Sequence, residues 1–219
     1  MQLMILSDIH GTMDFLPQVI KPMAEADLVV VAGDITTFGD AEKSRSVIES
    51  LASVNPRILA VSGNCDLADM DPYLAERGMG LHATCQQVDG IDFMGVSGSL
   101  PSPGSTPNEL GESRFLQHLE KALKQREPGS RPLVLVSHQP AYGTSLDRAG
   151  GGGHTGSTAL RDFIDRERPI LAVSGHIHES SGTDRLDDCT LVNPGPFKFG
   201  DYACAEITNG SVSVHCHQV

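Results

Sequence analysis

The sequence predicts an α/β fold, and three observations support that prediction. Short apolar segments rich in Val, Ile and Leu recur without strict alternation of apolar and polar residues, which is typical of strands buried on both faces. Helical patterns lie between several of these segments, and such alternation favours a substantially parallel sheet. An Asn-Gly pair near the C-terminus adds an antiparallel hairpin. We therefore expect mixed sheets, for which two stacked sheets with helices outside are one arrangement.

The individual elements follow from local patterns. Five apolar runs predict strands at residues 3–6, 28–32, 58–61, 133–136 and 170–173. Apolar stripes at helical spacing predict four helices, carried by Phe15, Val19, Ile20 and Met23; Val47, Ile48 and Leu51; Phe115, Leu116, Leu119 and Leu123; and Leu160, Phe163 and Ile164. The last three stripes follow possible N-caps at Asp40, Ser113 and Ser157.

Two hairpins and one long loop complete the expected fold. The Asn209-Gly210 turn sets Ile207 opposite Val212 and joins strands at residues 202–208 and 211–217. A second hairpin is expected from residues 80–88 and 91–96. Residues 98–111 are rich in Ser, Pro and Gly, and both a functional loop and a mobile surface insert fit this composition.

Composition excludes several classes of protein. The chain has 219 residues, 28 acidic against 16 basic, and a formal net charge of −12, which argues against binding of long nucleic acids or anionic membranes. No apolar run approaches the roughly 18–20 residues of a membrane helix. The five cysteines are never spaced as CxxC, so we expect reduced thiols in a cytoplasmic protein. We expect residues 1–219 to form a single domain.

Each of the five strands predicted from apolar runs ends in a polar segment. These segments are Ser7-Asp8-Ile9-His10-Gly11, Gly33-Asp34, Ser62-Gly63-Asn64-Cys65-Asp66, Ser137-His138 and Ser174-Gly175-His176-Ile177-His178. Ligand sites of parallel α/β sheets lie beyond the carboxyl ends of the strands, so we expect these side chains to converge. Carboxylate, imidazole and amide ligands without thiolate suit Mn²⁺, Fe²⁺ or Zn²⁺.

The five segments resemble the motifs of the calcineurin-like metallophosphoesterase superfamily, whose pattern is DxH, GD, GNHD, a lone histidine and GHxH. The resemblance extends to Asn193-Pro194-Gly195 and so covers almost the whole chain. It implies a four-layer αββα sandwich, with two mixed β-sheets flanked by helices, that holds two divalent metal ions, Mn²⁺ before Fe²⁺ or Zn²⁺. By this resemblance the first metal takes Asp8, His10, Asp34 and His178. The second takes Asp34, Asn64, His138 and His176, with Asp34 bridging.

One position departs from the superfamily pattern. Cys65 replaces the GNHD histidine, as in some small prokaryotic phosphodiesterases of the superfamily. That histidine contacts the phosphate and helps to protonate the leaving group, whereas a thiol with a pKa near ~8.5 is a less versatile acid. Asp66, which would orient the histidine, is expected to hold the Asn64 loop instead.

A glycine-rich loop offers a second candidate for the missing acid. His154 lies in residues 150–157, directly before a predicted helix whose N-terminus favours anions. We hypothesise that His154 contacts the substrate phosphate or the leaving oxygen. A solvent-exposed loop histidine is the alternative.

The resemblance implies hydrolysis of a small phosphate ester, a phosphodiester before a monoester, by attack of metal-bound hydroxide. Asp34, Asn64, Cys65, Asp66 and His154 are the candidate catalytic residues. Two alternatives remain open: a phosphomonoesterase, including a protein phosphatase, and a non-catalytic protein-binding scaffold of the same fold.

Overall fold

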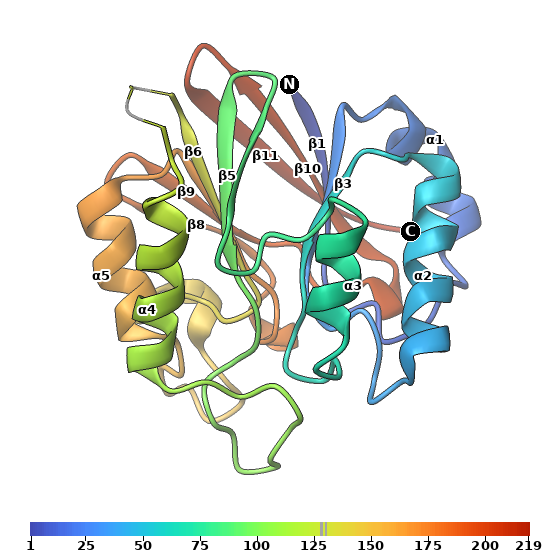
Figure 1. Ribbon diagram of the computed structural model, residues 1–219, viewed down its shortest axis with the longest axis horizontal. Helices are drawn as coiled ribbons and strands as arrows, with labels where there is room; N and C mark the ends of the chain where they lie inside the picture. The colour runs from blue at the N-terminus through green and yellow to red at the C-terminus, as the bar shows by residue number, and fades with distance from the viewer. Residues whose placement is uncertain (128, 130) are drawn as a thin grey trace.

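Two β-sheets stack face to face at the centre of the protein, with helices on both outer faces (Figure 1). The computed structural model describes residues 1–127, 129 and 131–219, apart from the side chain of Ala41. The order of layers is the αββα sandwich that the family resemblance implies, and that expectation is confirmed.

The first sheet has the strand order β11-β10-β1-β2-β3. Its members are β1 (Gln2–Leu6), β2 (Leu28–Ala32), β3 (Ile58–Val61), β10 (Asp201–Thr208) and β11 (Ser211–Gln218). Strands β1, β2 and β3 run parallel, and β10 pairs with β1 in the antiparallel sense. The hairpin register is confirmed, because Ile207 lies opposite Val212.

The second sheet has the order β4-β5-β6-β7-β9-β8, with antiparallel strands at both edges. Its members are β4 (Cys85–Val88), β5 (Ile91–Val96), β6 (Leu133–Ser137), β7 (Leu171–Val173), β8 (Gly182–Leu186) and β9 (Cys189–Asn193). The hairpin predicted from residues 80–88 and 91–96 is formed by β4 and β5. Its first strand is shorter than expected, since residues 80 and 82 form only isolated bridges. The β8–β9 hairpin was not predicted, because β8 alternates half-buried and exposed side chains without an apolar run.

The helices divide between the two outer faces. Those on the first sheet are α1 (Leu16–Glu25), α2 (Ala41–Val54) and α3 (Met70–Glu76), and those on the second are α4 (Glu112–Leu123) and α5 (Thr158–Glu167). Short 3₁₀ turns η1 (Ser145–Asp147), η2 (His178–Ser180) and η3 (Phe197–Phe199) lie in the loops. None of the helices in the described ranges is long and apolar enough to cross a membrane.

The predicted helix starts are correct in two of three cases. Asp40 caps α2 by accepting from the Lys43 N–H, and Ser157 caps α5 by accepting from the Leu160 N–H. The prediction for Ser113 is wrong: α4 begins two residues earlier than this cap implies, with Gly111 at the N-cap position, and Ser113 lies inside the helix.

The core is built from strands that are buried on both faces. In β1, Leu3 and Ile5 pack between the sheets, whereas Met4 and Leu6 pack beneath the helices. Two residues of the predicted helical stripes are exceptions, since Ile20 and Leu116 are exposed. With both sheets held by this core, the carboxyl ends of their parallel strands and the loops that follow them meet at one end of the molecule.

Candidate metal centre

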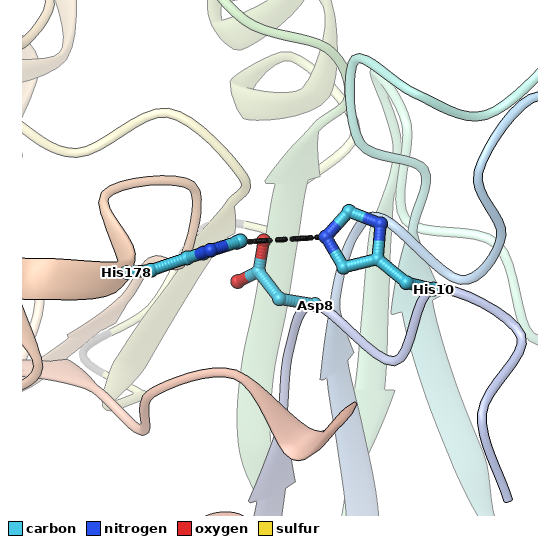
Figure 2. Close-up of side chains that lie close together, drawn as sticks. All are labelled: Asp8, His10 and His178. Carbon is cyan, nitrogen blue, oxygen red and sulfur yellow. Dashed lines mark hydrogen bonds and ion pairs between the residues drawn. The ribbon is translucent and has the colours of Figure 1, made fainter. Parts of the chain in front are cut away.

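Side chains from the two sheets meet where β1 and β7 end. His178, which follows β7, places its Nε2 atom 3.0 Å from Asp8 Oδ1 and 3.5 Å from His10 Nε2. Figure 2 shows the three side chains converging, with Asp8 and His10 on one loop and His178 on another. The His10 Nδ1 atom lies 2.8 Å from Thr37 Oγ1, a contact that turns Nε2 toward the cluster.

Asp34, which follows β2, stands between two groups of imidazoles. Its Oδ1 atom lies 3.4 Å from His138 Nε2, and its Oδ2 atom lies 3.7 Å from His10 Nε2. The carboxylate is buried and also accepts a 2.8 Å hydrogen bond from the Cys65 N–H. The two oxygens of one side chain therefore face two different sets of potential ligands.

Asn64 and His176 both lie beside His138. Asn64 Oδ1 lies 3.0 Å from His138 Nε2. His138 Nδ1 lies 2.8 Å from the Ala32 carbonyl, which can only accept, so Nδ1 carries a proton and Nε2 faces Asn64 and Asp34. The His176 ring centre lies 5.1 Å from that of His138, and the His176 N–H donates to Asp8 Oδ2.

The backbone of these loops is strained. Asp8, His10, Asp34 and His176 all have positive φ, at 54°, 52°, 48° and 69°. Left-handed backbone costs a non-glycine residue roughly 1–2 kcal/mol and is concentrated at functional sites. Hydrogen bonds between the loops hold it, since the Asp8 and His10 N–H groups donate to carbonyls of residues 33 and 34.

Two glycines allow the loops to approach so closely. A Cβ atom at Gly63 would collide with the Asp34 carboxylate and backbone, and one at Gly175 would collide with Ser7 Oγ. No other residue type fits either position without moving a loop that carries candidate ligands.

Burial makes the charges of the cluster depend on one another. Burial disfavours the Asp34 carboxylate, but the neighbouring His138 outweighs it and lowers the Asp34 pKa. Burial likewise disfavours the His138 imidazolium, and the Asp34 charge reverses the effect and raises the His138 pKa to about 9. For His176, burial and the nearby His138 lower the pKa to about 4. The buried carboxylates thus require a positive charge among them.

The arrangement fits divalent metal ions. Three overlapping groups each bring their ligand atoms within 4.8 Å of one another: Asp8, His10 and His178; Asp8, Asp34 and His138; and His10, Asp34 and Cys65. The first two contain only oxygen and nitrogen donors, and Asp34 occurs in two of the three groups. A cation would replace the proton on His138 and satisfy lone pairs that otherwise face each other.

Comparison with known proteins decides the family. A sequence profile described as "Calcineurin-like phosphoesterase" matches residues 1–180. The chain belongs to the calcineurin-like phosphoesterase family. It is also 32% identical over 209 residues to the uncharacterized protein MJ1162 of Methanocaldococcus jannaschii, covering 92% of this chain and 91% of that protein.

Solved structures with this fold show the same architecture at low sequence identity. The protein TT1561 of Thermus thermophilus superposes with a TM-score of 0.74 at 17% identity, covering 98% of this chain and 97% of that one. A dimetal phosphatase from Danio rerio gives 0.62 at 12% identity, covering 95% and 93%. A structure described as a novel archaeal phosphodiesterase gives 0.56 at 15% identity, covering 99% and 100%.

In this calcineurin-like chain Cys65 and Asp66 behave differently from each other. Burial and the charge of Asp34 raise the pKa of the Cys65 thiol, so the side chain is neutral. Asp66 is buried and accepts from the N–H groups of Ile35, Thr36 and Gly63 at 2.7–3.0 Å. Burial and the Asp34 charge raise the Asp66 pKa to about 6. Its carboxylate ties the loop after β2 to the loop after β3.

His154 lies in a loop that packs against the residues after His178. Its Nδ1 atom is 2.6 Å from the buried Asp147 Oδ1, which leaves Nε2 available to another partner. The loop is attached near the site, since the Ser180 hydroxyl donates to the Arg148 carbonyl. The metal-ligand groups described above do not include His154.

The loop at residues 98–111 contributes residues that the motifs do not identify. Asn64 Nδ2 donates to Thr106 Oγ1 at 3.0 Å, and that hydroxyl donates to Glu109 Oε1 at 2.8 Å. Asn108 Nδ2 donates to the Gly63 carbonyl. The loop therefore orients the Asn64 amide, and its length between β5 and α4 was the one signal of this role in the sequence.

Replacing Asp66 with alanine is expected to destabilise the metal-free protein by roughly 3 kcal/mol or more, because three buried N–H groups lose their acceptor. Asp66→Asn keeps one acceptor oxygen, so its stability should lie between those of the wild type and Asp66→Ala. Urea unfolding measures the difference, with Asp162→Ala on the exposed face of α5 as control. Equal unfolding midpoints for Asp66→Ala and Asp162→Ala would contradict this role.

Proposed function

We propose that this protein hydrolyses a small phosphodiester with the aid of two divalent metal ions. The observation that carries the proposal is Asp34, whose two oxygens face separate sets of ligand atoms at 3.4 Å and 3.7 Å. Asp8, His10 and His178 would complete one site with Asp34, and Asn64, His138 and His176 the other. These are the ligand sets that the family resemblance implies.

When bound, two divalent ions supply Lewis-acid activation of water and charge neutralisation for a phosphoryl group. The chain's own residues prepare such a centre in three ways. Asp34 fixes the spacing of the two ligand sets. Thr37 and the Ala32 carbonyl orient the imidazoles of His10 and His138, an outer contact that supports metal affinity. Asp66 holds the loops in register.

Diester hydrolysis is favoured over the alternatives by two considerations. Cys65 offers a neutral thiol where many members of the family have a histidine, as in the small phosphodiesterases that the chain resembles. The similar fold described as an archaeal phosphodiesterase supports the same choice. A phosphomonoesterase is the second candidate, supported by the dimetal phosphatase of similar fold. A non-catalytic scaffold is disfavoured, because every position at which the family pattern expects a metal ligand carries a suitable side chain.

The donor set and composition suggest the metal and the setting. Oxygen and imidazole donors suit Mn²⁺ first, with Fe²⁺ or Zn²⁺ as alternatives. We place the protein in the cytoplasm, since its five cysteines are free thiols, which is typical of a reducing compartment. The net charge of −12 makes long nucleic acids poor substrates.

Asp34→Asn tests the centre directly. The amide keeps the shape but loses the charge that both ligand sets share, so we expect bound Mn²⁺ to fall from two per chain to one or fewer. Turnover of bis(p-nitrophenyl) phosphate should fall by about a hundredfold or more. Metal analysis and steady-state kinetics measure both, with Asp162→Asn as control. A wild-type protein that binds no metal, or an Asp34→Asn variant with unchanged turnover, would refute the proposed enzymatic activity.

A second experiment separates a diesterase from a monoesterase. It compares turnover of p-nitrophenyl phosphate, its bis ester and a panel of cyclic nucleotides.

Metal binding should release a proton from His138. Its pKa of about 9 in the metal-free protein means that the ring is protonated at pH 7 and must lose that proton to bind a cation. The Mn²⁺ affinity should therefore rise with pH and level off above about 9. Calorimetric titration in two buffers with different ionisation enthalpies counts the protons. His138→Gln should abolish this release, and an unchanged count in that variant would exclude His138 as its source.

His154 is proposed to contact the substrate phosphate or the leaving oxygen, with Asp147 orienting its ring. Removing a general acid typically costs 10²–10⁴-fold in rate, and the loss is largest for a poor leaving group. We therefore expect His154→Ala to reduce kcat/KM for an alkyl phosphodiester far more than for the nitrophenyl ester. The exposed His215 on β11 provides the control, as His215→Ala. Full kcat/KM of His154→Ala on the alkyl ester would eliminate the role.

A further inference from the structure

The exposed aromatic side chains of this protein lie in the loops around the metal centre. The chain has seven phenylalanines and three tyrosines, and four of the phenylalanines are fully buried. Three aromatic residues are exposed by more than two-fifths: Phe38 at 54%, Phe199 at 58% and Tyr142 at 44%. We call these three residues the aromatic rim.

Each residue of the aromatic rim is attached to a loop that carries candidate ligands. Phe38 follows Thr37, the residue in contact with His10, and its N–H donates to the Cys65 carbonyl at 2.9 Å. Phe199 follows Lys198, whose N–H donates to the Asp8 carbonyl.

Tyr142 belongs to the loop that begins at His138, and its ring centre lies 5.5 Å from that of His154. Three separate loops thus bring exposed rings to one end of the molecule. Scattered exposed apolar residues need no explanation, but their concentration around a site indicates a ligand.

Phe38 is unfavourable to the free protein in two respects. Its φ is 52°, a left-handed conformation that is a clear outlier for a bulky residue and that glycine or asparagine adopts at lower cost. Its ring is also exposed to water, so it gains little from burial. Residues with strained backbone cluster at active sites and ligand-binding segments.

A positive charge accompanies the rim. Lys198 Nζ lies 5.2 Å from the centre of the Phe199 ring. The Lys198 N–H donates to the carbonyl of Asp8, so this lysine lies next to a segment that carries candidate ligands. A ligand here would therefore combine a flat apolar part with an anionic part.

We propose that Phe38 stacks against a planar aromatic or heteroaromatic ring of the phosphate ester, with Phe199 and Tyr142 as further ring contacts. The natural substrate is then an ester that carries such a ring. This inference rests on the proposed phosphoester hydrolysis. Phe38 would act as a specificity residue, while the bond-breaking groups remain those of the metal centre.

Two phosphonates that cannot be hydrolysed test the proposal without relying on turnover. Phenylphosphonate and methylphosphonate share the anionic group and differ in the ring. Stacking on an aromatic side chain makes us expect the Mn²⁺-loaded protein to bind phenylphosphonate about tenfold more tightly by calorimetry. Phe38→Ala should bring that ratio close to one with methylphosphonate binding unchanged, and Phe38→Trp should restore it. The exposed Leu116 on α4 supplies the control, as Leu116→Ala.

Phe38→Gly separates a binding role from a structural one. Because glycine tolerates left-handed backbone, we expect Tm to stay level or rise by up to about 2–4 °C, while the preference for the ring is lost. A lower Tm with the preference retained would overturn the proposal.

The remaining outcomes distinguish this proposal from the proposed function. Equal affinity of wild-type protein for both phosphonates, with ester turnover intact, overturns the aromatic substrate and leaves the hydrolase standing. Failure to bind either phosphonate, together with no turnover of any ester, overturns both.

Discussion

The buried carboxylate of Asp34 is the constraint around which the functional end of this protein is organised. Its negative charge lies out of water near a second buried carboxylate, Asp8, and such charges are costly unless positive charge or hydrogen bonds compensate them. Here the Cys65 N–H and the imidazoles of His10 and His138 face the Asp34 oxygens. Divalent metal ions bound here would add positive charge to this balance and would supply Lewis-acid chemistry.

The sandwich makes this compensation possible because it joins two sheets at one end. The first sheet brings Asp8, His10, Asp34 and Asn64, and the second brings His138, His176 and His178. Neither sheet alone carries a complete ligand set, so the apolar layer between the sheets also fixes the geometry of the centre. Strained loop backbones and two close glycine contacts are the local cost of this convergence, and the stability of the core compensates for it.

Outside the metal ligands, the loops are specialised for different tasks. The loop after β5 orients Asn64 through Thr106, and the loop after β6 positions His154 on the buried Asp147. The aromatic rim lies on the same end of the molecule and carries no expected metal ligand. Chemistry and substrate selection therefore draw on separate residues of neighbouring loops, so selectivity can change through the rim while the ligand set is kept.

The strand runs and the candidate ligands could be predicted from the sequence, because apolar runs and short motifs are local properties, whereas the sandwich followed from the family that these motifs resemble. The sequence did not reveal the β8–β9 hairpin, whose edge strand lacks an apolar run, and it misplaced the cap of α4. The tertiary structure alone shows that Asp147 holds His154 and that Thr106 orients Asn64. It also gives the geometry of the bridging position that the resemblance implies for Asp34. Each of these contacts joins residues brought together by packing, and the length of the loop at residues 98–111 was the one indication of them in the sequence. The role proposed for Phe38 likewise depends on the tertiary structure, since an exposed ring in left-handed backbone is a property of the folded loop.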